Sequence, residues 1–149
     1  MSISFTAALG ALKTQLEGNA ALAAFCQSKW NRDLTVSISY KKRVEIHTSD
    51  LPVILITRPS VAKSHLTGAR DGQHTVRLYA GFHQPDRAQA QLDLIEFEEL
   101  LDDAVLSDHT LGGTAISAIP TESANDEGEH HPVYFMAADV EVKHRREEA

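Results

Sequence analysis

The chain has 149 residues, 42% of them hydrophobic and 23% charged, which is the size and composition of one soluble globular domain. The net charge is −7, from 14 basic and 21 acidic residues, so bulk electrostatics give no attraction for nucleic acid or an anionic membrane. No apolar run approaches the ~18 residues that cross a bilayer, we expect no secretory signal because the start lacks a basic leader pattern, and the single cysteine excludes an intramolecular disulfide.

The first thirty residues favour helix. Apolar residues recur there at spacings of four, three and four, which places them on one helix face: Phe5, Leu9, Leu12 and Leu16. Ser4 suits the N-cap, and the Gly18-Asn19 pair suits the end of the helix. An alanine-rich piece then runs from residue 20 toward Trp30, and alanine has the highest helix propensity. We expect one helix or a broken helical hairpin.

Two stretches in the next part of the chain favour strands. From Leu34 to Tyr40 apolar and polar residues alternate, which predicts a half-buried strand with Leu34, Val36, Ile38 and Tyr40 on its buried face. A piece at residues 44–46 could continue the sheet after a turn. The run from Leu51 to Thr57 is almost entirely apolar, which predicts a strand covered on both faces with Pro52 at its start.

The periodicity disappears between residues 58 and 73. Pro59, Gly68 and Gly72 interrupt a polar stretch there, and connections of this length without structure are uncommon in compact domains. We predict that residues 58–73 form a mobile loop or a hairpin arm.

The second half contains the clearest helix. A strand is predicted at 74–82, followed by a helix from Asp86 to Leu106 whose buried stripe is Ala90, Leu94, Phe97, Leu101 and Ala104. Four acidic residues are assigned to its solvated side: Asp93, Glu96, Glu99 and Asp103. A weak strand at 114–119, an acidic loop at 124–129, a last strand at 133–143 and a frayed tail at 144–149 complete the chain.

This order of elements predicts one α+β domain over residues 1–149. Helices at the start and between strands favour helices packed on one face of a mainly antiparallel or mixed β-sheet, with a long loop projecting from it. The other face, rich in serine, threonine and arginine, is left for solvent or a partner.

Patterns that carry chemistry are weak. Glu129, His130 and His131 offer metal ligands, but neighbouring side chains on an extended chain point to opposite faces, so a solvated acidic loop is the favoured interpretation. No nucleophile elbow or phosphate loop is present in the sequence. Cys26 lies in an alanine-rich helical segment, where a small buried thiol is the ordinary role. We therefore predict no enzyme activity, no catalytic or metal site and no cofactor.

Charged clusters are the remaining candidates. Lys41, Lys42 and Arg43 form a basic knot without interleaved aromatic residues, which is a poor footprint for nucleic acid. A patch that pairs with a neighbouring acidic surface is an equal alternative. The acidic residues of the long helix are interpreted as solvated, with an electronegative surface that repels a polyanion or meets a basic partner as the alternative.

The organisation of the chain resembles the tail terminator proteins of long-tailed bacteriophages, the lambda-type minor tail protein family. The resemblance covers nearly the whole chain and rests on the order of elements and not on a short signature. It includes an N-terminal helix before an early strand, a Leu51-Pro52-Val53 segment leading into a strand, and a strand ending near Phe82 before a long helix. A small strand, an acidic loop at Ala124–Glu129 and a final strand at Val133–Lys143 follow.

The resemblance implies a virion structural protein, assembled in the host cytoplasm and located at the head-proximal end of the tail. Such proteins form rings of six subunits that cap the tail tube, end its growth and join the tail to the head or neck. The implied partners are further copies of the chain, the tail tube protein and a head-completion or neck protein. DNA would pass through the bore without specific binding, and no membrane is involved.

Six basic residues are predicted as interface residues. We expect Arg58, Lys63 and Arg70 to dock an acidic partner surface, and Lys41, Lys42 and Arg43 to meet acidic groups of the next subunit. Two alternatives remain open: a head-closure or neck adaptor protein, and a small metal-dependent enzyme that uses Glu129, His130 or His131.

Overall fold

The computed structural model describes residues 3–42, 45–66 and 69–147 and contains three long helices and a five-stranded sheet. In chain order the elements are α1 (Phe5–Glu17), α2 (Ala20–Trp30), β1 (Thr35–Ile38), a 3-10 turn (Thr48–Asp50), β2 (Val53–Leu66), β3 (Ala69–His83), α3 (Arg87–Leu106), β4 (Ser117–Asn125) and β5 (Val133–Glu147). The predicted α+β class is confirmed.

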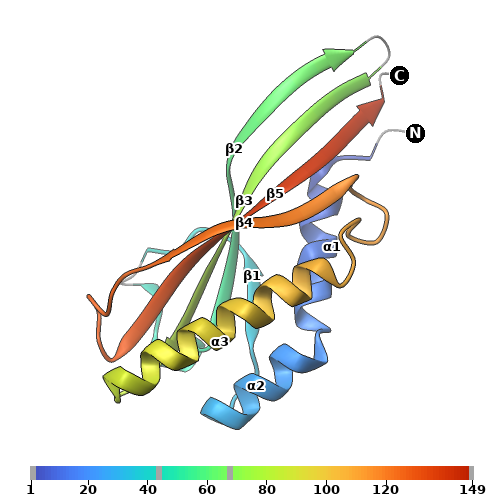
Figure 1. The fold of residues 1–149 in the computed structure, drawn as a ribbon. Helices are drawn as coiled ribbons and strands as arrows, with labels where there is room; N and C mark the ends of the chain where they lie inside the picture. Colours follow the sequence, from blue (N-terminus) through green and yellow to red (C-terminus); the bar gives the residue numbers. More distant parts are fainter. Residues whose placement is uncertain (1–2, 43–44, 67–68, 148–149) are drawn as a thin grey trace.

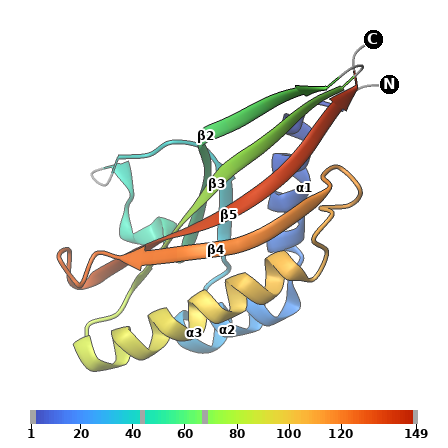
Figure 2. The ribbon, with the colours of Figure 1, turned by 45° about the horizontal axis from the view of Figure 1, so that its top comes forward.

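The sheet is mixed, with strand order β1-β2-β3-β5-β4. β1 pairs with β2 in parallel, and the other three pairings are antiparallel. All three helices lie on one face of the sheet, as the two views of the ribbon show (Figures 1 and 2). The other face lacks an α-helix among the described residues, and the segment between β1 and β2, which contains the 3-10 turn, runs across part of it (Figure 2).

Helix ends follow the predicted capping chemistry. The Ser4 hydroxyl accepts a hydrogen bond from the amide of Thr6, which begins α1. The Asp86 carboxylate accepts from the amides of Ala88 and Gln89, which begins α3. Both predicted helix starts are confirmed.

The main core lies between the helices and the sheet. Its largest fully buried side chains come from every layer: Phe82, Phe97, Leu12, Leu16, Leu22, Ile54, Ile56, Leu78 and Leu101. Each of them removes apolar surface from water and contributes roughly 1.5–3 kcal/mol of burial free energy. No helix among the described residues is long and apolar enough to span a membrane.

A second, smaller core lies on the helix-free face. Leu51, Val53, Leu55 and Phe135 form it, with Ile46 and Val133 packed against them. Because the neighbouring residues Ile54 and Ile56 point into the main core, β2 is covered on both faces at its start. This confirms the prediction drawn from the unbroken apolar run.

Residues 58–66 and 69–73 lie in strands and not in a mobile loop. β2 and β3 pair out to Leu66↔Ala69, and β3 pairs with β5 out to Ala69↔Glu147, so three strands form a long arm. The arm extends away from α2 and α3, and β5 ends at its distal end (Figure 1). Residues 67 and 68 are outside the described residues.

The expected frayed tail is also a strand as far as the structure describes it. Residues 144–147 pair with residues 69–72 of β3, and residues 148 and 149 are outside the described residues. This pairing could not be predicted from the sequence, because both faces of the arm carry polar side chains and the strands therefore lack an apolar alternation.

Three smaller expectations need correction. β1 covers four residues at the sheet edge, so Val36 is buried whereas Ile38 and Tyr40 are exposed. Glu45 and Ile46 are not in a strand, and Val44 is outside the described residues. The weak strand expected at 114–119 begins at Ser117 and continues to Asn125 as β4.

The largest error concerns Asp93, which was expected on the solvated side of α3. Its carboxylate is fully buried and accepts hydrogen bonds from the side-chain amides of Gln89 (2.7 Å) and Gln84 (3.2 Å). Lys29 of α2 lies 3.2 Å from the same carboxylate. A buried charge is tolerated where it is paired and hydrogen-bonded in this way.

Candidate interaction surfaces

The predicted interface residues lie on two separate surfaces. Lys41 and Lys42 line a groove on the helix-free face, which we call the sheet-face groove. Arg58, Lys63 and Arg70 all line a second groove beside the arm, which we call the arm groove. Arg43 lies outside the described residues. The structure thus brings Arg58, Lys63 and Arg70 together and places them apart from Lys41 and Lys42.

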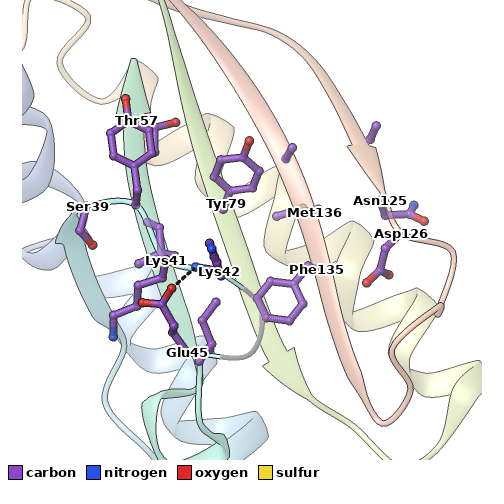
Figure 3. Close-up of a pocket in the computed structure, with 15 residues that line it drawn as sticks. Ser39, Lys41, Lys42, Glu45, Thr57, Tyr79, Asn125, Asp126, Phe135 and Met136 are labelled. Atoms are coloured by element: carbon purple, nitrogen blue, oxygen red, sulfur yellow. Dashed lines mark hydrogen bonds between the residues drawn. The ribbon is translucent and has the colours of Figure 1, made fainter. Parts of the chain in front are cut away.

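The sheet-face groove has a volume of about 660 Å³ and a largely apolar floor. Tyr79 of β3 and Phe135 of β5 point into it from the sheet, and the segment carrying Lys41 and Lys42 faces them (Figure 3). The Lys42 amide donates to the Glu45 carboxylate at 3.3 Å, which links these two residues of the segment.

Lys41 already has an acidic neighbour inside the chain. Its ammonium nitrogen lies 4.0 Å from the Asp50 carboxylate, and both side chains are about one-third exposed. An exposed pair of this kind contributes little to stability, so it leaves Lys41 available for a second acidic group.

The arm groove has a volume of about 440 Å³ and lies between the start of α1 and the face of the arm on the helix side of the sheet. The strand register lines up its basic side chains in a row. His65 of β2 is opposite Arg70 of β3, and Arg70 is opposite Arg146 of β5. Lys63 stands in the next row, opposite Gly72. This arrangement concentrates positive charge on one face of the arm.

His74 closes the inner end of the arm groove. The imidazole is 8% exposed and stacks on the Phe5 ring with centroids 3.5 Å apart. Its Nδ1 atom has no hydrogen-bond partner among the described residues. Burial, with the positive charges of Arg58 and Lys63 nearby, lowers the pKa of His74 to about 4. The groove therefore presents a neutral imidazole among cations at neutral pH.

The opposite face of the arm balances its charges within the chain. Arg145 donates two hydrogen bonds to Asp71, at 2.6 and 2.9 Å, and Arg77 donates two to Asp139, at 2.7 and 3.1 Å. The hydrogen bonds from Arg145 hold the pKa of Asp71 below its ordinary value, and those to Asp139 hold the pKa of Arg77 above its ordinary value. Asp71 is the one acidic residue among the described residues that line the arm groove, and its carboxylate pairs with Arg145.

The residues considered for metal or nucleophilic chemistry do not form a site. No group of three histidine, cysteine or acidic residues is close enough to hold a metal ion in the described part of the chain. His130 lies 3.9 Å from Glu129, whereas the His131 Nδ1 atom is hydrogen-bonded to the Tyr134 hydroxyl. Burial raises the pKa of the Cys26 thiol to about 12, which keeps it protonated and unreactive.

Arg146 and Phe5 are among the arm-groove residues that the sequence did not predict. Arg146 was assigned to a frayed tail, and Phe5 was counted as part of a helix stripe. Arg146 could be assigned to the groove only if the pairing of the strands in the arm were already known. Phe5 gives no local signal, because its stacking partner His74 is far away in the sequence.

Comparison of the sequence with protein-family models and with curated proteins finds no match. Comparison of the structure finds a similar fold in a chain of the virion of a native gene transfer agent (GTA) particle. That likeness has a TM-score of 0.55 at 13% sequence identity and covers 93% of each chain. It establishes that the two chains share a fold over nearly their whole lengths.

Proposed function

We propose that this protein is a virion structural protein of a phage-like particle, and more specifically a tail terminator. In this role, six copies form a ring on the head-proximal end of the tail tube, stop its growth and present a surface to the head or neck. The protein acts by shape and docking and not by catalysis.

The observation that carries this proposal is the whole-chain likeness to a GTA virion chain. A fold shared over 93% of both chains supports a structural role in a phage-like virion. Fold likeness alone does not fix function, so the specific role rests on the surfaces described above.

The surfaces suit a ring built from head-to-tail contacts. A contact between two different patches of one chain closes into a ring when its rotation is right and otherwise gives a filament. The arm projects from the body of the domain (Figure 2), and the arm groove beside it is one candidate for such a patch.

The charge of the chain suits a channel for DNA. Six copies of a chain with net charge −7 carry about −42 together. A bore that is negative overall neutralises few phosphates, and DNA affinity grows with the number of phosphates neutralised. DNA would therefore pass through without being held.

A head-closure or neck adaptor is the second candidate, because it would use the same fold and ring geometry. The two differ in the partner that they recognise, since a terminator binds the open end of a tail tube. The metal-dependent enzyme has no support from the positions of Glu129, His130 and His131.

The test is to add the purified protein to growing tubes of the cognate tail tube protein. A terminator binds tube ends, visible as rings by negative-stain imaging, and fixes tube length in proportion to the amount added. Tubes that elongate at an unchanged rate with bare ends would contradict the proposal. Binding to the neck complex instead would favour the adaptor.

A further inference from the structure

The solvent-exposed side of α3 carries a stripe of aliphatic and acidic side chains. Three large aliphatic side chains on it are exposed: Leu92 by 60%, Ile95 by 44% and Leu106 by 51%. Glu96, Glu99 and Asp103 are exposed on the same side. At about 100° per residue these six positions fall within one face of the helix, opposite the buried stripe. We call this face the α3 ridge.

The acidic groups of α3 crowd one another. Burial, with the negative charges of Glu98, Asp103 and Glu99, raises the pKa of Asp102 above its ordinary value. No ion pair joins Glu96, Glu99 or Asp103 to a cation within the described residues. A cationic partner would relieve this repulsion, and exposed aliphatic residues beside charges are typical of a docking surface.

The arm groove has the complementary composition. Arg58, Lys63 and Arg146 supply positive charge, while Phe5, Leu9 and Val61 supply partly exposed apolar surface between the cations. A helix that presents aliphatic and acidic side chains along one face fits a groove with this mixture. His74, buried and stacked on Phe5, lines the same groove at its inner end.

We propose that the arm groove of one copy receives the α3 ridge of the next copy. The contact is heterologous, because it joins two different surfaces of the same chain, and this is the type of contact that generates a closed ring. The inference rests on the proposed ring-forming function and names the two surfaces that meet in it.

A nucleic acid is the competing ligand for a basic groove. The apolar residues between the cations and the net charge of −7 favour a protein helix over a phosphate backbone. Binding of DNA in the arm groove would overturn the proposal.

The test is a charge swap measured by sedimentation equilibrium of the full chain. The basic variant is Lys63→Glu with Arg146→Glu, the acidic variant is Glu99→Lys with Asp103→Lys, and the swap variant carries all four changes. All four side chains are exposed, so the fold should be kept, and circular dichroism checks this. Matched controls are Lys13→Glu with Arg32→Glu, and Glu122→Lys with Glu129→Lys, which change the charge equally elsewhere.

The proposal predicts that the wild-type chain self-associates and that added salt weakens the association. The basic and acidic variants should each raise the dissociation constant at least about tenfold, the swap variant should recover most of the loss, and the controls should match the wild type. A wild-type chain that stays monomeric, or a swap variant no better than the single-surface variants, would overturn it. So would a fluorescent single-stranded oligonucleotide that binds the wild type and not the basic variant while self-association is unchanged.

The result separates this inference from the proposed function. If the single-surface variants still form rings and cap tubes, the docking assignment is wrong and the terminator role stands. If the swap variant recovers self-association but neither it nor the wild type binds a tube end, the docking assignment stands and the terminator role is wrong.

Discussion

The buried Asp93 carboxylate on α3 lies 3.2 Å from the Lys29 ammonium group on α2. Asp93 is fully buried, whereas the Lys29 side chain is 30% exposed, so the lysine reaches the carboxylate from the surface. The side-chain amides of Gln84 and Gln89 donate hydrogen bonds to the same carboxylate. This cluster ties α2, α3 and the end of β3 together.

Replacing Asp93 with alanine should lower the free energy of unfolding by about 2 to 3 kcal/mol, because two amides lose a charged acceptor inside the protein. Urea denaturation measures the change. Asp103→Ala, on the exposed side of the same helix, serves as the control and should stay within about 0.5 kcal/mol of the wild type. Equal effects of the two substitutions would show that the buried cluster adds nothing.

Gly81 should not tolerate a side chain. A Cβ atom there would lie 2.5 Å from the Phe135 ring, which lines the sheet-face groove, so Gly81→Ala must displace that ring. We expect a loss of about 1 to 3 kcal/mol in thermal or urea unfolding. Gly10→Ala is the matched control, because no atom lies within 4 Å of its Cβ and alanine favours the helix by about 0.5–1 kcal/mol. A neutral Gly81→Ala would contradict the packing described.

Stability should fall as the pH drops from about 6.5 to about 4. The unfolded chain protonates His74 at the ordinary pKa of 6.5, whereas the folded protein does so only at about 4. The unfolded state therefore binds more protons in this window, and the native state loses stability as the pH falls through it. His144 acts in the same direction, because burial lowers its pKa too.

The size of the His74 effect should be about 1 to 2 kcal/mol after allowance for screening at the open side of the groove. Urea unfolding at pH 7 and pH 4.5, for the wild type and His74→Gln, measures it. The variant should depend less steeply on pH. If the two proteins lose the same stability between these pH values, the titration does not belong to His74.

Reversing the basic knot should weaken ring assembly. Lys41→Glu with Arg43→Glu reverses two charges that we expect to meet acidic groups of the next subunit, and Lys13→Glu with Arg32→Glu makes the same charge change elsewhere. Sedimentation velocity measures the fraction of rings at one protein concentration. Rings that form equally well in both variants would remove Lys41 and Arg43 from the interface.

The elements that could be predicted from the sequence are those whose apolar residues recur at a regular spacing. The long helix was predicted because its buried stripe repeats at helical spacing, and β2 was predicted as far as Thr57 because its start is covered by two cores. The arm was not resolved between loop and strand, because a three-stranded ribbon with polar side chains on both faces has no alternation to detect.

The candidate surfaces were only partly predictable for the same reason. Arg58, Lys63 and Arg70 were selected as charges in an irregular stretch, and the strand pairing that gathers them is not visible locally. Asp93 was misplaced because its partner Lys29 belongs to another helix. Both the arm groove and the burial of Asp93 depend on which distant segments of the chain pack together.

The most direct test of the account is native mass spectrometry of the purified protein, followed by imaging of the same sample with tail tubes. A ring-forming terminator should give a closed species of six 16.3 kDa chains, about 98 kDa in total, that binds tube ends and stops elongation. A chain that remains monomeric both alone and with tubes, while the tubes keep growing, would contradict it.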